Sequence, residues 1–222
     1  MSDWMKLFEM LKKYRRQLLL TMAVCIFLFI ACALKLNQLS AFDQQVYTFV
    51  SLAISKTLTP LMRLLTELGG TLGLVLLCAI GALLLMLMKK RVLACLMISN
   101  LAITAASNVL LKQLFIRPRP IGYRLIEIDG YSFPSGHSMA AMAFYGYLIY
   151  LIWHKLEVKW QKYLFTCLLS LLIVLIMLSR IYLGVHYASD VLAGAAAALA
   201  ILICFTSCTR KYCLLELNDK KD

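Results

Sequence analysis

Long stretches of nearly uncharged residues constrain this chain more than any other feature of its sequence. A helix that crosses the hydrocarbon core of a bilayer needs about 20 mostly apolar residues. Five stretches meet this requirement, and a sixth does so if its helix starts a few residues earlier. They are residues 18–36, 71–88, 92–111, 163–178 with their flanks and 188–205, with 138–153 as the sixth. Because lipid cannot pair with backbone polar groups, the sequence predicts an all-α membrane protein with six transmembrane helices.

The overall composition agrees with this prediction. Hydrophobic residues make up 62% of the 222 residues and charged residues only 15%, whereas a typical soluble domain has about 25% charged residues. So large an apolar surplus cannot be buried in one soluble core of this length. We find no internal repeat, and we expect a single integral-membrane domain over residues 1–222.

The positions of lysine and arginine predict how the helices are oriented. If the N-terminus lies inside, most of the 23 Lys and Arg residues fall in the inner segments, as the positive-inside rule requires. Both termini are therefore expected in the cytoplasm. This placement accounts for the net charge of +12, so no nucleic-acid partner is expected. No small-residue cleavage site follows the first apolar run convincingly, which favours a retained helix over a signal peptide.

The segment 42–68, between the first two spans, has apolar residues at roughly helical spacing with polar residues such as Asp43 between them. We expect an amphipathic surface region of one or two helices on the outer face of the membrane, broken or kinked at Pro60. Such helices could simply pack against the spans. They could also form a lid, or a wall through which lipid enters.

Metal and disulfide chemistry find little support in the sequence. The eight cysteines form no CxxC pair and lie mostly within apolar helices, so we expect neither a disulfide framework nor a zinc site. No cluster of Asp and Glu on the outer side could easily hold magnesium. We therefore expect no metal and no other cofactor.

Three polar clusters stand out, and all fall on the predicted outer side. His186 and Asp190 belong to the third cluster, and their spacing of four puts both on one face of a helix. A carboxylate beside an imidazole selects its tautomer and stabilises the imidazolium, which leaves the other nitrogen free to attack an electrophile. The alternative is a hydrogen-bonded pair at the start of a helix.

Three cations in these clusters oppose the positive-inside bias: Lys112, Arg119 and Arg180. Guanidinium and ammonium groups suit phosphate oxygens, and three of them match the three equatorial oxygens of a phosphoryl group in its transition state. The alternative is snorkelling to lipid head groups. For Arg117 and Arg124 we expect only snorkelling.

The second cluster is the sequence Pro-Ser-Gly-His at 134–137, directly before an apolar helix. Gly136 lets the backbone approach a ligand, and free N–H groups at a helix N-terminus bind anions. Ser135 could cap the helix or donate to phosphate. His137 would then lie beside a leaving oxygen as a general acid. The alternative is a plain helix start with a capping serine.

Taken together, the clusters resemble the consensus of the type 2 phosphatidic acid phosphatase superfamily. That consensus is lysine, six residues and Arg-Pro, then Pro-Ser-Gly-His, then Ser-Arg, five residues, His, three residues and Asp. Order and spacing agree, and the likeness covers about residues 18–205. The chain has the consensus residue at every fixed position, namely Lys112, Arg119, Pro120, Pro134, Ser135, Gly136, His137, Ser179, Arg180, His186 and Asp190.

This resemblance implies a role for each site residue. His186 would attack phosphorus and form a phosphohistidine, Asp190 would orient His186, and His137 would protonate the leaving group. Water would then cleave the phosphohistidine. Phosphate would be bound by a set of five residues, namely Lys112, Arg119, Ser135, Gly136 and Arg180.

The resemblance also implies a metal-independent lipid phosphatase, with its substrate and the bilayer as partners. We expect a catalytic core at about 42–205, cytoplasmic tails at 1–16 and 207–222, and an active site on the outside of a bacterial cytoplasmic membrane. Small bacterial members of the family act on phosphatidylglycerophosphate, phosphatidic acid, diacylglycerol pyrophosphate or undecaprenyl pyrophosphate. We expect the first or the last, and the last would mean recycling of the cell-wall carrier lipid.

Other functions remain open at this point. The same site could serve a phosphotransferase that passes the phosphoryl group to another lipid. From a different class, a lipid transporter or scramblase could use the basic residues only to bind head groups, although it would need neither histidine. Vanadium haloperoxidases share these site residues but are soluble, which argues against that activity here.

Overall fold

The computed structural model describes residues 3–122 and 124–218, with side chains described over residues 13–122 and 124–217. Over the described residues the protein is all-helical and contains no strand. Its eight helices are α1 (Asp3–Lys35), α2 (Ser40–Ser51), α3 (Leu58–Glu67), α4 (Thr71–Leu87), α5 (Arg91–Phe115), α6 (Gly136–Lys155), α7 (Lys159–Tyr182) and α8 (Ala188–Asn218).

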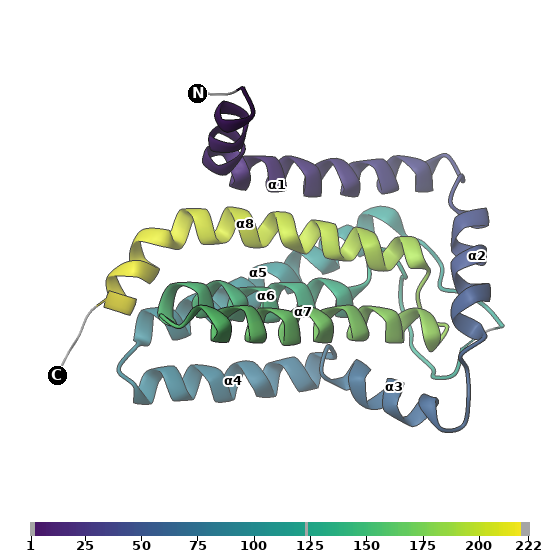
Figure 1. Cartoon of the computed structure of the whole chain (residues 1–222). Helices are drawn as coiled ribbons and strands as arrows, with labels where there is room; N and C mark the ends of the chain where they lie inside the picture. The colour runs from purple at the N-terminus through teal and green to yellow at the C-terminus, as the bar shows by residue number, and fades with distance from the viewer. Residues whose placement is uncertain (1–2, 123, 219–222) are drawn as a thin grey trace.

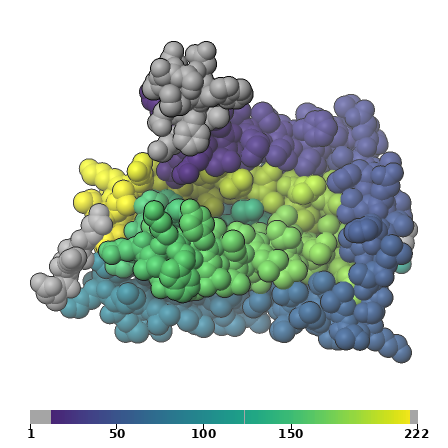
Figure 2. Space-filling view, viewed as in Figure 1, coloured from purple at the N-terminus to yellow at the C-terminus, as the bar shows by residue number. Residues whose placement is uncertain are grey.

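The long helices run side by side, and their connections gather at the two ends of the bundle (Figure 1). α1 begins and α8 ends at one end, where the α4–α5 and α6–α7 connections also lie. At the other end, α2 runs across the bundle nearly perpendicular to the long helices. In the space-filling view, α2 and α3 cover this second end (Figure 2). The irregular segment 116–135 and the turn between α7 and α8 lie there too.

α6 is the central helix of the bundle. It packs against α5, α7 and α8, and its buried side chains include Met139, Ala143 and Tyr147. α8 approaches the start of α6 closely, because a Cβ added at Gly194 would lie 2.7 Å from the carbonyl oxygen of Ser135. Only glycine permits that contact without a backbone shift, so Gly194 determines how closely the helix bearing Asp190 meets the Pro-Ser-Gly-His turn.

The predicted spans are all helical, but the count of six is not confirmed. By length and composition, four helices could cross a membrane: Lys13–Lys35, Arg91–Phe115, Lys159–Tyr182 and Ala188–Leu217. A fifth is possible if α3 and α4, bent by 52° relative to each other, form one broken span. α6 fails the test, and its position explains why. Neighbouring helices surround it, so it can carry tyrosines and small polar residues that a lipid-facing helix would avoid.

The predicted amphipathic region consists of α2 and α3, with one error of detail. Pro60 does not break the region, since it is the third residue of α3, in the first turn where proline removes no helical hydrogen bond. The break lies at residues 52–57 instead. Nor is Asp43 on a solvated face: it is only 4% exposed and points toward the α8 side of α2, where it bonds Ser189.

Candidate active site

One cavity of about 410 Å³ lies at the end of the bundle that α2 and α3 cover. Its apolar wall comes from α4 and α5, with residues such as Leu74, Leu101 and Val109. Its polar lining includes six of the eight predicted site residues, namely Lys112, Arg119, Gly136, His137, Arg180 and His186. Residues from five different segments therefore converge on one space.

His186 lies in the turn between α7 and α8 and is only 3% exposed. Its Nε2 lies 3.1 Å from Nη1 of Arg119. Because a guanidinium only donates hydrogen bonds, Nε2 is the acceptor and Nδ1 carries the proton. That proton faces Ser132 Oγ at 3.3 Å and Asp190 Oδ2 at 3.5 Å. The ring is thus held in the tautomer with an unprotonated Nε2, which faces Arg119 at the cavity.

Burial keeps this imidazole neutral. It lowers the pKa of His186 to about 4, and the hydrogen bond and charge of Asp190 raise it only in part. A nucleophilic nitrogen must be unprotonated to attack. The His186 imidazole therefore has, near neutral pH, the protonation state that an attacking nitrogen requires.

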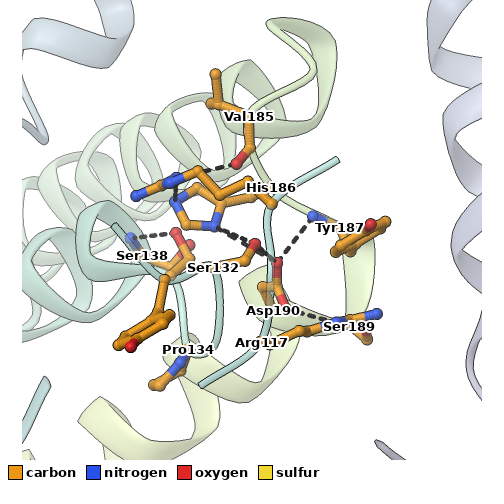
Figure 3. Close-up of polar contacts among 12 residues, drawn as sticks. Arg117, Ser132, Pro134, Ser138, Val185, His186, Tyr187, Ser189 and Asp190 are labelled. Atoms are coloured by element: carbon orange, nitrogen blue, oxygen red, sulfur yellow. Dashed lines mark hydrogen bonds and ion pairs between the residues drawn. The ribbon is translucent and has the colours of Figure 1, made fainter. Parts of the chain in front are cut away.

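Asp190 is completely buried in the first turn of α8. Its Oδ2 accepts hydrogen bonds from the Ser132 hydroxyl and from the backbone N–H of Tyr187, the latter at 2.9 Å. Its Oδ1 accepts from Nη1 of Arg117 at 2.6 Å. Figure 3 shows His186 on one side of the carboxylate and Arg117 on the other. Several donors thus hold Asp190 in its charged form and in one orientation.

Arg180 is the most unusual cation at the cavity. Its side chain is 1% exposed, and Nη1 donates to the hydroxyl of Thr66 in α3. Nε and Nη2 find no hydrogen-bond acceptor among the residues that the structure describes. A buried guanidinium with two unpaired nitrogens is costly in free energy. It is also a ready donor to an anion in the cavity.

The other two cations are tied to the irregular segment. Arg119 donates through Nε to the carbonyl oxygens of Asp129 and Gly130 and through Nη1 to that of Val185, at 3.0 to 3.2 Å. Burial lowers the pKa of Arg119 below its ordinary value, without removing its charge near neutral pH. The Lys112 ammonium donates to the carbonyl oxygen of Tyr131. These bonds place both cations at the cavity.

The Pro-Ser-Gly-His turn divides between the cavity and the core. Gly136 and His137 line the cavity, and a Cβ at Gly136 would lie 3.0 Å from Asn108 Oδ1. Ser135 does not line it. Its Oγ accepts from the N–H of Ser138 at 3.4 Å, and its own N–H donates to the backbone oxygen of Asp190. Ser135 therefore caps α6. Of the eight predicted site residues, Asp190 is the other one that does not line the cavity, because it lies behind His186.

Comparison with known proteins agrees with this geometry. The model of the PAP2 superfamily matches residues 92–212, more than half of the chain. Phosphatidylglycerophosphatase B of Bacillus subtilis (strain 168) is 30% identical over 176 residues, which are 79% of this chain and 87% of that protein. The chain belongs to the PAP2 superfamily.

Other comparisons extend the finding. A crystal structure of a transmembrane PAP2 type phosphatidylglycerolphosphate phosphatase from B. subtilis matches with a TM-score of 0.80 at 29% identity, covering 86% of this chain and 96% of that one. A candidate undecaprenyl-diphosphatase, YbjG of Escherichia coli (strain K12), is 36% identical over 104 residues, 45% of this chain and 48% of that protein. Aquifex aeolicus LpxE, at 23% identity and a TM-score of 0.58 over 75% of this chain and 94% of that one, shares the fold. The predicted family and the predicted enzyme class, a lipid phosphatase, are thus confirmed.

Sequence reasoning about this PAP2 protein missed residues that complete the site. Ser132 bridges His186 and Asp190, but no spacing rule connects it to either. Arg117 does not snorkel to lipid: its side chain is 12% exposed and forms ion pairs with Asp43 and Asp190. Its position two residues before Arg119 was the only available signal, and it was read as a topology feature.

Asn108 was also missed, although it lies one helical turn before Lys112 on α5. Its Nδ2 donates to the carbonyl oxygen of Pro134 at 3.1 Å and so supports the turn before α6. The hydroxyl of Ser179, which belongs to the consensus, donates to the carbonyl oxygen of Ile176 in its own helix. Among residues 13–122 and 124–217, no three His, Cys, Asp or Glu side chains gather as a metal ion would require. A metal-free reaction remains a prediction.

Proposed function

We propose that this PAP2 enzyme removes a phosphoryl group from a lipid phosphate or pyrophosphate by a two-step displacement through His186. The observation that carries the proposal is the convergence of His186, His137 and three cations on one cavity. The unpaired N–H groups of Arg180 support an anionic ligand there. A phosphoryl group has the charge and the number of oxygens to satisfy these donors.

In the first step, Nε2 of His186 attacks phosphorus while the bond from phosphorus to the leaving oxygen breaks. Arg119 now donates to Nε2, and on binding it turns its N–H toward a phosphoryl oxygen, which frees the lone pair. Burial and the neighbouring cations lower the pKa of His137 in the resting enzyme, so the proton comes with the substrate. His137 takes it from the phosphate monoanion and gives it to the leaving oxygen. The imidazolium of the phosphohistidine keeps its Nδ1 proton, and Asp190 stabilises the new positive charge.

In the second step, a water molecule replaces the leaving group on the opposite side of phosphorus from His186. His137, now neutral, takes a proton from the water as the oxygen attacks. The bond between phosphorus and Nε2 breaks, and its electron pair returns to the ring. The cations stabilise the equatorial oxygens in both steps. Phosphate leaves with the proton from His137, and both histidines return to their neutral starting states.

The apolar wall of the cavity suits a lipid. Leu74, Val75, Leu101 and Val109 line it on α4 and α5, the outer surfaces of which expose many large apolar side chains to the bilayer. A phosphate ester could therefore enter with its first methylene groups against this wall. The named relatives suggest phosphatidylglycerophosphate and undecaprenyl pyrophosphate as the two substrates to compare, and kcat/KM for each with purified protein would rank them.

The site should face the outside of the membrane. The Lys and Arg distribution supports this orientation, and α1 begins and α8 ends at the bundle end opposite to the cavity. In a cysteine-free background, a cysteine placed at Gly122 should react with an impermeant maleimide in intact cells. Labelling only after permeabilisation would put the site in the cytoplasm.

Phosphate release in detergent tests the reaction itself. Release from a short-chain lipid phosphate should survive EDTA and should be inhibited by vanadate, which mimics the transition state. His186→Ala should abolish release, and His154→Ala is a matched control because His154 is exposed and lies at the other end of α6. Full loss on chelation would refute the metal-free mechanism, and turnover in His186→Ala would exclude that nucleophile. A transporter would release no phosphate, and a phosphotransferase would require a lipid acceptor.

A further inference from the structure

Two carboxylates share one guanidinium directly behind the proposed nucleophile. Nη1 of Arg117 lies 2.6 Å from Asp190 Oδ1, and Nη2 lies 2.7 Å from Asp43 Oδ2. We propose that Asp43 and Arg117 are positioning residues that set the net charge acting on His186. This inference rests on the proposed phosphohistidine mechanism, and it assigns a role in catalysis to α2.

The cluster is closely built and well buried. Ser189 donates to Asp43 twice, through its N–H at 2.9 Å and its hydroxyl at 2.8 Å, and it accepts from Arg117 Nη1 at 2.8 Å. The Arg117 guanidinium also lies 4.0 Å from the centre of the Tyr187 ring. Asp43 is 4% and Asp190 is 0% exposed. Asp43 and Arg117 also line a cavity of about 440 Å³ that water can enter. Asp190 is fully buried on the other side of Arg117, so its charge is the least screened and acts strongly on His186.

The balance of charge in this cluster matters for the reaction. Phosphorylation of Nε2 with Nδ1 still protonated places a positive charge on the imidazole of His186. That charge needs a net negative neighbour, because Arg119, Arg180 and the other cations around the cavity oppose it. If Arg117 paired with Asp190 alone, the pair would be neutral. Since Asp43 shares Arg117, the three groups together keep one net negative charge.

Asp43 therefore does more than attach α2 to the bundle. A surface helix could be anchored by a neutral hydrogen bond, such as the one that the N–H of Ser55, just after α2, donates to the Tyr182 hydroxyl. A buried carboxylate is more costly in free energy than such an anchor. Its placement on the far side of Arg117 is explained if it draws part of the guanidinium charge away from Asp190.

A double-mutant cycle tests whether the net charge of Asp43, Arg117 and Asp190 controls the reaction at His186. Asp43→Asn keeps the shape of the side chain but neutralises the cluster, so kcat should fall about tenfold, the factor that corresponds to one pKa unit of interaction, with KM unchanged. Arg117→Gln leaves two buried carboxylates without their cation and should also lower kcat. The double variant Asp43→Asn with Arg117→Gln again carries one net negative charge, on Asp190. It should therefore be more active than Asp43→Asn alone.

The measurement is the single-turnover rate of phosphohistidine formation with the purified full chain, next to steady-state kcat and KM. Glu127→Gln and Lys56→Gln are matched controls for the loss of one charge of each sign, since both side chains are exposed and neither belongs to the cluster. If Arg117→Gln does not fold, the comparison of kcat between Asp43→Asn and the double variant still tests the role of the net charge. Thermal stability in detergent is measured for every variant.

The outcomes separate this inference from the proposed function. A structural role alone predicts that the double variant is no more active than Asp43→Asn, and that result would overturn the inference. So would wild-type kcat in Asp43→Asn. If the wild type forms no phosphohistidine and releases no phosphate, the proposed function fails first. Higher activity in the double variant, with unchanged KM throughout, is the expected result.

Discussion

Replacing Arg180 by methionine separates catalysis from stability at one position. Arg180 is 1% exposed, and two of its three guanidinium nitrogens have no hydrogen-bond partner among the described residues. Methionine has a similar length and is apolar, so it can occupy the same buried space. We expect Arg180→Met to lose activity and to keep or gain thermal stability.

The magnitudes follow from the hydrogen bonds. Nε and Nη2 would each donate to the phosphoryl group, and bonds to a charged group contribute about 1.5 to 3 kcal/mol each. Losing both raises the barrier by about 3 to 6 kcal/mol, so kcat/KM should fall by roughly 10²- to 10⁴-fold. In the resting protein the same unpaired groups cost about 1 to 3 kcal/mol each. Removing them offsets the loss of the charge-assisted bond to Thr66, which contributes about 1.5 to 3 kcal/mol.

The assay combines turnover with thermal unfolding in detergent, each with and without vanadate. A ligand that binds only the folded state raises Tm, so vanadate should stabilise the wild type and not Arg180→Met. Arg63→Met is the matched control, because Arg63 is exposed and donates only to the carbonyl oxygen of Leu125. It should behave as the wild type does.

Two results would refute this reasoning. Turnover within threefold of the wild type would show that Arg180 does not hold the phosphoryl group. A Tm lowered by many degrees, with loss of folded protein, would show that the guanidinium stabilises the resting fold. In that case its unpaired nitrogens could not be read as a binding site.

Three further predictions can be checked with the same protein. Gly194→Ala should lower the free energy of unfolding by about 1 to 3 kcal/mol, seen as a lower Tm, because the new Cβ would meet the backbone oxygen of Ser135. Gly81→Ala is the control and should cost less, because its Cβ would meet the flexible end of Met97. Equal losses in the two variants would contradict the argument. Ser132→Ala should lower kcat about tenfold with little change in KM, because it removes the hydroxyl that bridges His186 and Asp190. A change in KM alone would instead assign Ser132 to substrate binding. Because the pKa of His186 is lowered to about 4, its imidazole is unprotonated above that pH, and activity should fall as the pH drops through it. The pH profile of kcat/KM, corrected for ionisation of the substrate phosphate, measures this. An enzyme group that limits kcat/KM with a pKa near 6.5 would not be His186.

The sequence predicted the helices well because their cause is local. An apolar run must be helical in lipid wherever it packs, so every predicted span coincides with part of a helix, and only Leu36 and Met88 fall beyond a helix end. An error arose where a residue has two local readings. The sequence favours a break at Pro60, whereas proline is tolerated in the first turn of a helix. A sixth span at α6, which its neighbours largely enclose, stays a prediction.

By itself, the sequence determined the membrane environment and the identity of the chemical groups, because hydropathy and motif spacing are written along the chain. The tertiary structure decided which groups meet. It brought Ser132 to His186, turned Ser135 into a cap, and paired Arg117 with two carboxylates, one of them 74 residues away on α2. Such pairs depend on the packing of distant helices, and no local pattern encodes that packing.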